Sequence, residues 1–155
     1  MNSFLKTHLQ ASNRKGAFFL FLLFIGLLII DIYTRYFCFL ENCNFNFYGA
    51  GLTQFKNFNF AFSLEVPSLV MYGLYFLLVV SLLAFGYTNL FRWQPWTQVA
   101  WICIFAGAAG NIGERIFLGY VRDFIRIGTG FINLGDVYIV LGVAYILWQS
   151  FKHSE

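Results

Sequence analysis

Long runs of apolar residues, separated by short polar segments, dominate the chain. An α-helix needs about 20 residues to cross the hydrocarbon core of a bilayer, and four apolar runs meet or approach that length. We predict that they form four membrane-spanning helices, at approximately residues 17–40, 68–87, 97–112 and 131–148. The third is short by this measure. Pro67 precedes the second, at a position that the start of a helix tolerates.

The composition favours a membrane environment. Hydrophobic residues make up 59% of the 155 residues and charged residues 11%. A soluble domain carries roughly 25% charged residues, so this chain cannot cover a water-facing surface with charge. We predict a single integral membrane domain over residues 1–155, of the all-α class. The net charge of +3 is scattered, and it forms no basic stripe that would predict a nucleic-acid partner.

Basic residues at the ends of the spans predict the topology. They precede the first span, separate the second from the third, and follow the fourth: Lys6, Arg14, Lys15, Arg92 and Lys152. With four crossings these places share one side, which the positive-inside rule makes cytoplasmic, together with both termini. The N-terminal run resembles a signal peptide, but no small-x-small cleavage site follows it. We therefore expect an uncleaved first span.

Three further segments have expected roles. Residues 41–65 lie outside and alternate Asn, Phe and Gly, which favours a small β-like or loop cradle at the interface between the first two spans. Residues 107–110 (GAAG) predict close helix packing. Four tryptophans fit the cytoplasmic interfacial belt: Trp93, Trp96, Trp101 and Trp148.

The three cysteines have no metal-binding spacing, so no zinc site is predicted. We expect unpaired thiols at Cys38, Cys43 and Cys103. A Cys38–Cys43 disulfide is the alternative if both residues face an oxidising compartment.

Ionisable residues gather at the external end of the predicted bundle. They are Asp31, Arg35, Glu114, Arg115, Asp123 and Asp136. Such residues at membrane depth are costly, tend to be functional and usually have partners. Asp31 and Arg35 lie four residues apart, so they share a helix face and can pair. The cluster predicts a site reached from that membrane face.

Two of these residues form a candidate catalytic pair. Asp123 falls in the short loop after the third span, and Asp136 opens the fourth. Two carboxylates a few ångströms apart share one proton, so one can act as general base on water while the other polarises a carbonyl, without a cofactor. A structural role is the favoured interpretation on spacing alone. Asp123 could pair with Arg122, Arg126 or Arg115, and Asp136 could cap the fourth helix.

Four motifs resemble those of the signal peptidase II (lipoprotein signal peptidase) family. Residues 110–115 (GNIGER) and 119–125 (GYVRDFI) look like its GN-x-x-DR…G-x-V-x-DF signature. Residues 133–136 (NLGD) are similar to its FN-x-AD motif. Residues 31–35 (DIYTR) are similar to D-x-x-(T/S)-K, and residues 56–63 (KNFNFAFS) to N-x-G-A-A-F. The motifs come in the family's order and on the expected spans.

The resemblance implies a four-helix membrane aspartyl peptidase with Asp123 and Asp136 as its catalytic pair. It implies supporting or substrate-contacting roles for Asn111, Arg115, Asn133, Asp31, Arg35, Asn57 and Glu114. The implied substrate is a prolipoprotein with diacylglycerol on a cysteine, cleaved just before that cysteine in the bacterial inner membrane, near its outer face. The expected partners are diacylglyceryl prolipoproteins and membrane lipid. We expect a monomer without a cofactor or metal.

The chain departs from the family pattern at five positions. Glu114 replaces Asp, Arg35 replaces Lys, Asn59 replaces Gly, and Gly113 and Gly135 replace larger residues. We expect the two glycines to loosen packing beside the site. These departures motivate an alternative hypothesis, a catalytically inactive lipoprotein-binding or scaffold protein of the same fold. A further alternative is an ion or proton carrier that uses its buried carboxylates.

Overall fold

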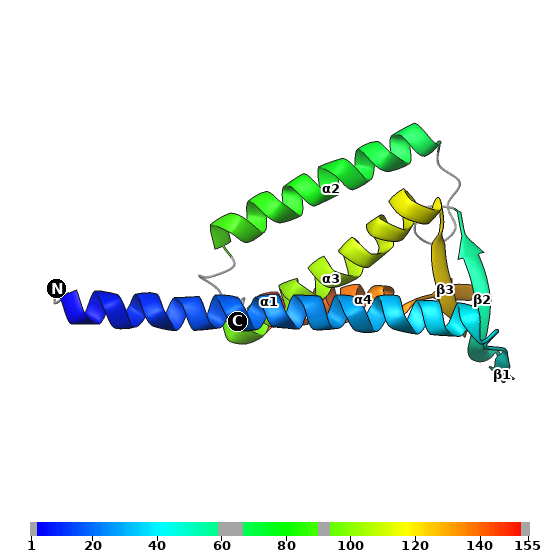
Figure 1. Ribbon diagram of the computed structural model, residues 1–155, viewed down its shortest axis with the longest axis horizontal. Coiled ribbons are helices and arrows are strands. Elements are labelled where there is room, and N and C mark those ends of the chain that lie inside the picture. The colour runs from blue at the N-terminus through cyan, green and yellow to red at the C-terminus, as the bar shows by residue number, and fades with distance from the viewer. Residues whose placement is uncertain (1–2, 59–66, 90–93, 153–155) are drawn as a thin grey trace.

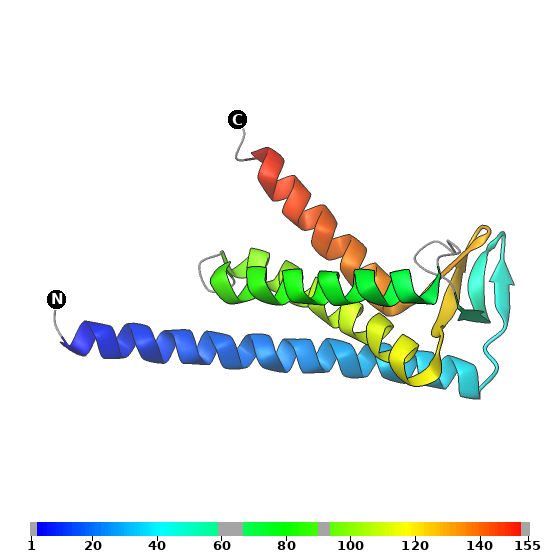
Figure 2. The ribbon, with the colours of Figure 1, turned by 90° about the horizontal axis from the view of Figure 1, so that it is seen from above.

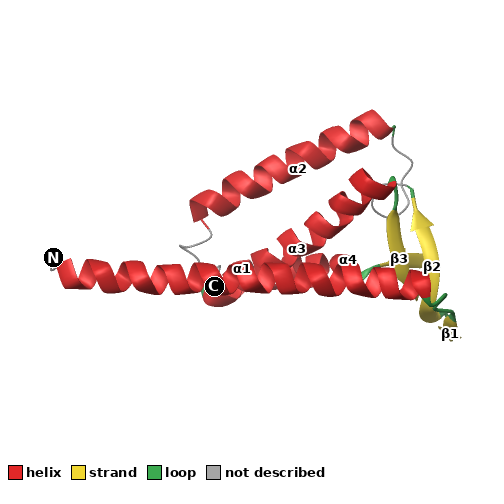
Figure 3. Ribbon diagram, in the orientation of Figure 1, coloured by secondary structure: helices red, strands yellow, loops and turns green. Residues whose placement is uncertain are grey.

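The computed structural model describes residues 3–58, 67–89 and 94–152. Four helices and four strands follow one another as α1 (Ser3–Leu40), β1 (Phe45–Phe47), β2 (Ala50–Asn57), α2 (Ser68–Asn89), α3 (Pro95–Leu118), β3 (Val121–Ile127), β4 (Gly130–Ile132) and α4 (Leu134–Lys152). The strands form a sheet at one end of the helices, while the start of α1 and the end of α4 lie away from it (Figures 1 and 2). Figure 3 shows this division into a helical part and a sheet-capped end.

Three helical segments in the described part of the chain are long and apolar enough to cross a membrane. They are Lys15–Leu40 within α1, Pro95–Leu118 and Leu134–Lys152. Large apolar side chains are exposed along them, as at Phe19, and lipid is the solvent that accepts such a surface. Helix α2 contains a shorter apolar stretch, Tyr72–Ser81. Three predicted spans are thus confirmed as span-length apolar helices, and a crossing by α2 stays a prediction.

Small residues let α3 pack closely against both α1 and α4. A Cβ atom on Gly107 would collide with the backbone oxygen of Gly135 in α4. A Cβ atom on Gly110 would lie 2.5 Å from Oδ2 of Asp31 in α1. The close-packing face predicted at residues 107–110 is confirmed, and it brings the ionisable residues of three helices together.

The sheet has the strand order β1-β2-β3-β4, and each neighbouring pair is antiparallel. The predicted β-like segment after the first helix is therefore a strand pair. The other two strands, β3 and β4, were not predicted, because the segment after α3 was expected to be a short loop. Asp123 lies in β3, opposite Phe55, rather than in a loop. The β-branched residues of β3 suit a strand, and pairing with β2 satisfies its backbone groups. Helix α4 consequently begins at Leu134, after β4.

Gln54 fastens β2 to the end of α1. Its Nε2 atom donates to the backbone oxygens of Cys38 and Phe39 at 3.2 and 3.0 Å, where the last turn of a helix leaves carbonyl groups without helical partners. These hydrogen bonds hold the sheet against the C-terminal end of α1, the helix that carries Asp31 and Arg35. Cys38, Cys43 and Cys103 are free thiols in this structure.

Candidate active site

A buried ion cluster centred on Arg35 forms the base of the site. Arg35 and Asp31 are both 0% exposed and make two contacts, Nη2–Oδ2 at 2.6 Å and Nε–Oδ1 at 3.0 Å. The predicted pairing of these residues is confirmed. Arg35 Nη1 also donates to Glu114 Oε2 of α3 at 3.0 Å. Glu114 in turn accepts hydrogen bonds from the Arg122 side chain and backbone, at 2.6 and 2.7 Å. The cluster thus joins α1, α3 and β3.

Two asparagines lie directly on this cluster. Arg35 Nη2 donates to Oδ1 of Asn111 and to Oδ1 of Asn133, at 2.8 Å in each case. Because a guanidinium can only donate, these contacts turn each amide oxygen toward Arg35 and each amide nitrogen away from it. The orientation of the two amides therefore follows from the position of one buried cation.

The amide nitrogens hold the two aspartates. Asn133 Nδ2 donates to Asp123 Oδ1 at 2.6 Å, and Asn57 Nδ2 of β2 donates to Asp123 Oδ2 at 3.0 Å. Asn111 Nδ2 donates to Asp136 Oδ1 at 2.8 Å. Asp123 is buried and Asp136 is half-buried. Residues of β2, β3 and α3 and of the start of α4 thus bring both predicted catalytic residues into one hydrogen-bond network.

Asp136 also caps α4. Its Oδ2 atom accepts the backbone N–H of Asn133 at 3.1 Å, and Asn133 Oδ1 accepts the backbone N–H of Asp136 at 3.0 Å. This reciprocal pair is a capping box, so the predicted capping role is confirmed. It leaves Oδ1 of Asp136 directed to Asn111, so capping is compatible with a place in the site.

The arginines considered as partners of Asp123 have contacts elsewhere. Arg122 pairs with Glu114, with Nη2 and Oε1 2.6 Å apart. Arg126 Nε donates to the backbone oxygen of Gly128 at 3.1 Å. Arg115 is buried, and its Nη1 donates to the backbone oxygen of Asn111 at 3.3 Å. Of the three possible partners of Asp123, Arg122 is therefore ruled out, because its side chain lies against Glu114.

Burial raises the pKa of Asp123 to about 6. The hydrogen bonds from Asn133 and Asn57 favour the ionised form and lower this pKa, whereas the neighbouring Asp136 carboxylate raises it. Both carboxyl groups also accept hydrogen bonds from Asn133, so they belong to one network. Asp123 consequently holds a proton at a higher pH than an exposed aspartic acid does.

Gly135 is a site residue whose role the sequence did not reveal. Its backbone N–H donates to Asp31 Oδ1 at 2.8 Å. A Cβ atom there would lie 2.8 Å from Arg35 Nη2 and 3.0 Å from Asn133 Oδ1. The expectation that Gly135 loosens packing is therefore wrong, because the Arg35 guanidinium fills the space beside it. Gly113 has nothing within 4 Å of its Cβ position, and Asn59 lies outside the described residues.

The described residues include no group of three or more His, Cys, Asp or Glu side chains that could hold a metal ion. They do include a buried carboxyl group with a raised pKa that interacts with a second carboxyl group. Both are held by amides at the sheet-capped end of apolar helices. Fold and site together define a membrane-embedded protein with a carboxylate pair at one end of its helices.

The chain belongs to the signal peptidase II family, since the family model described as signal peptidase (SPase) II matches residues 23–152. The chain is therefore a membrane-associated hydrolase of the protease class. The signal peptidase II family acts in lipoprotein signal-peptide processing. A comparison with curated proteins found no match.

Two similar solved structures are described as a "Bacterial membrane enzyme structure by the in meso method". The first has a TM-score of 0.75 at 21% identity, over 88% of this chain and 89% of the other. The second has a TM-score of 0.73 at 21% identity, over 86% of this chain and 92% of the other. At this identity the likeness shows a shared fold.

Proposed function

We propose that this protein is an aspartic endopeptidase that removes signal peptides from diacylglyceryl-modified prolipoproteins, cleaving just before the lipidated cysteine. The observation that supports this most is the position of Asn133 between the two aspartates. Its side-chain amide donates to Asp123, and its backbone N–H donates to Asp136. One residue thereby orients both carboxyl groups, as a two-carboxylate mechanism requires.

The raised pKa of Asp123 supports an assignment of roles. In our proposal Asp123 carries the shared proton and Asp136 is the ionised base. Asp136 takes a proton from water as the water oxygen attacks the scissile carbonyl carbon, while Asp123 protonates the carbonyl oxygen. The tetrahedral intermediate then collapses. Asp136 gives its proton to the departing nitrogen, and Asp123 recovers a proton from a hydroxyl group of the intermediate.

The supporting residues hold the pair rather than react. The Arg35–Asp31–Glu114 cluster fixes the two amides whose nitrogens face Asp136 and Asp123. A donor network that is already in place needs no reorganisation when the water attacks. We assign Asn111, Asn133 and Asn57 to orienting the aspartates, and Arg115 to the same supporting group.

The surroundings of the site suit a substrate anchored in lipid. In our proposal α2 is a fourth crossing, both termini are cytoplasmic, and the sheet-capped end lies at the outer face of the bacterial inner membrane. In Figure 1 the chain runs toward the sheet in α1 and α3, and away from it in α2 and α4, as four crossings require. The diacylglycerol of the substrate would keep its scissile bond at the depth of the two aspartates. In our proposal the protein acts as a monomer, because all the residues assigned to the site belong to one chain.

The substrate class can be tested with purified protein in lipid nanodiscs. The same prolipoprotein is supplied with and without diacylglycerol on its cysteine, and mass spectrometry identifies the products. We expect release of the signal peptide from the modified form, with the lipidated cysteine as the new N-terminus. Equal cleavage of both forms, or cleavage at another bond, would contradict the proposed specificity.

The hypothesis of an inactive scaffold rests on departures that the site accommodates. Arg35 contacts both asparagines, and Glu114 reaches Arg35 and Arg122 at once. The same assay separates the alternatives, because a scaffold would bind the modified prolipoprotein without releasing a peptide. A proton carrier would instead conduct protons in liposomes.

A further inference from the structure

A recess of about 440 Å³ lies between the start of α3 and the last turns of α4. Its lining residues are Gln94, Trp96, Tyr145, Trp148, Gln149 and Lys152. The volume falls within the range of about 300–1,000 Å³ found for small-molecule sites. The recess lies at the end of the helices away from the sheet, so it is separate from the aspartates and their supporting residues.

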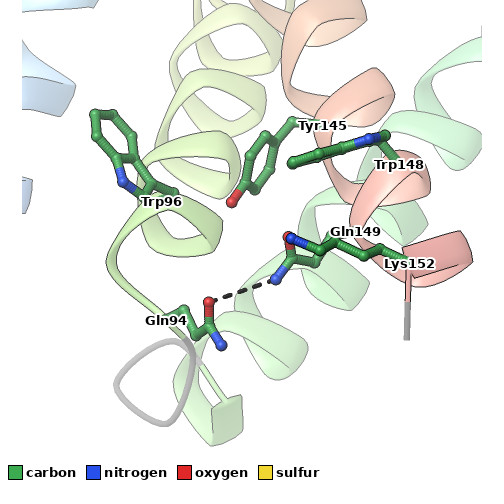
Figure 4. A pocket seen from close by; sticks show the side chains of 6 residues that line it. All are labelled: Gln94, Trp96, Tyr145, Trp148, Gln149 and Lys152. Carbon is green, nitrogen blue, oxygen red and sulfur yellow. Dashed lines mark hydrogen bonds between the residues drawn. The ribbon is translucent and has the colours of Figure 1, made fainter.

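The lining is aromatic and cationic. Lys152 Nζ lies 5.6 Å from the centre of the Trp148 ring, and the Tyr145 and Trp148 rings have centroids 5.7 Å apart. Gln149 Nε2 donates to Gln94 Oε1 at 3.4 Å across the two helices. Figure 4 shows the Tyr145 hydroxyl directed toward the space between Trp96 and Gln94. None of the lining residues is acidic.

This chemistry favours an anion with an apolar attachment. Lys152 supplies a positive charge, and the Gln, Tyr and Trp side chains supply neutral hydrogen-bond donors. Because the ammonium group already lies over the Trp148 ring, a second cation such as choline would be repelled from that aromatic surface. A negatively charged phosphate diester has the complementary charge.

The position of the recess indicates where such an anion comes from. The apolar helices α3 and α4 begin and end beside it, and Trp, Tyr and Lys at the ends of spans lie at the level of lipid head groups. A role for Lys152 at the C-terminus of α4 accounts for the charge but not for the adjoining recess. We propose that the recess binds the phosphate head group of an anionic phospholipid in the leaflet opposite the aspartates. This inference depends on the chain being a membrane protein and not on peptidase activity.

Binding can be measured by native mass spectrometry of the detergent-purified full chain, titrated with phosphatidylglycerol, with phosphatidylcholine or with inorganic phosphate. We expect phosphatidylglycerol to bind in preference to phosphatidylcholine, and inorganic phosphate not to displace it. Lys152→Gln should weaken phosphatidylglycerol binding about fivefold, since one lysine near a membrane surface contributes on the order of 1 kcal/mol. Lys152→Arg should retain most of the binding.

Lys15 provides the matched control. It is an exposed lysine at the start of the apolar segment of α1 and does not line the recess. Lys15→Gln should leave phosphatidylglycerol binding unchanged. Equal losses in Lys15→Gln and Lys152→Gln, or equal binding of phosphatidylcholine, would overturn the proposal in favour of general surface attraction. Displacement by inorganic phosphate would overturn it in favour of a site for free anions.

Discussion

Arg35 and Gly135 fit together because Gly135 has no Cβ atom. The nearest guanidinium nitrogen of Arg35 lies 2.8 Å from the position that such an atom would take. The same nitrogen donates to Asn111 and Asn133. The glycine in α4 therefore permits a large buried cation on α1, and that cation orients the two amides that face the aspartates.

Gly135→Ala should push the Arg35 guanidinium away from its partners. We expect a loss of about 1–3 kcal/mol in stability, as for other overpacked sites, and a marked fall in peptidase activity. Gly113→Ala is the control, because the Cβ position of Gly113 is open. Since alanine stabilises a helix by up to about 1 kcal/mol relative to glycine, this variant should not lose stability. Thermal unfolding and peptide release should be measured on both variants.

A double substitution tests the coupling directly. The smaller head group of lysine leaves more room, so Arg35→Lys should restore part of the activity that Gly135→Ala removes. The two changes together should then cost less than the sum of their separate effects. Strict additivity of the two effects would show that Arg35 and Gly135 act independently.

Asn133 has two separable roles, in capping α4 and in orienting Asp123. Asn133→Ser keeps a side-chain oxygen for the cap but loses the amide nitrogen that donates to Asp123. We expect it to retain most of the stability and to lose up to roughly tenfold in kcat, because a hydrogen bond to a neutral, protonated carboxyl contributes about 0.5–1.5 kcal/mol. Asn133→Ala should additionally lose about 1 kcal/mol of stability. Parallel losses of kcat and stability in both variants would contradict an orienting role.

The raised pKa of Asp123 predicts a pH profile. If Asp123 must hold the shared proton, kcat/KM should fall as the pH rises through about 6. Asn57 stabilises the ionised form of Asp123, so Asn57→Ala should raise this pKa and move the alkaline limb upward, by about one pH unit. Asn46→Ala, an exposed asparagine on β1, should leave the limb in place. A limb that moved to lower pH in Asn57→Ala would contradict the proposed protonation state.

Local features of the site could be predicted from the sequence, because they depend on fixed helical spacings. Asp31 and Arg35 are four residues apart on one helix. Asn133 and Asp136 lie three apart at a helix start, a spacing that a capping box uses. Apolar run length identified three of the span-length helices, and small residues identified the packing face of α3.

Long-range features could not be predicted in the same way. Asn57 reaches Asp123 across 66 residues of sequence, through the pairing of β2 with β3. No local sequence pattern distinguished β3 from a short loop between spans. The fit of Gly135 to Arg35 likewise depends on how closely α4 approaches α1. Arg122 was one of three possible partners of Asp123, but its side chain lies against the buried carboxylate of Glu114, eight residues earlier in the sequence on α3.

The assignment of Asp123 and Asp136 as the catalytic pair is tested most directly by the rate of signal-peptide release in Asp123→Asn and Asp136→Asn. Both rates are compared with that of Glu41→Gln, which alters an exposed carboxylate at the end of α1. Melting temperatures establish that each variant is folded. We predict that each aspartate variant loses roughly 10³-fold or more in kcat, while Glu41→Gln retains the wild-type rate. A folded Asp123→Asn or Asp136→Asn variant with wild-type turnover would contradict the assignment.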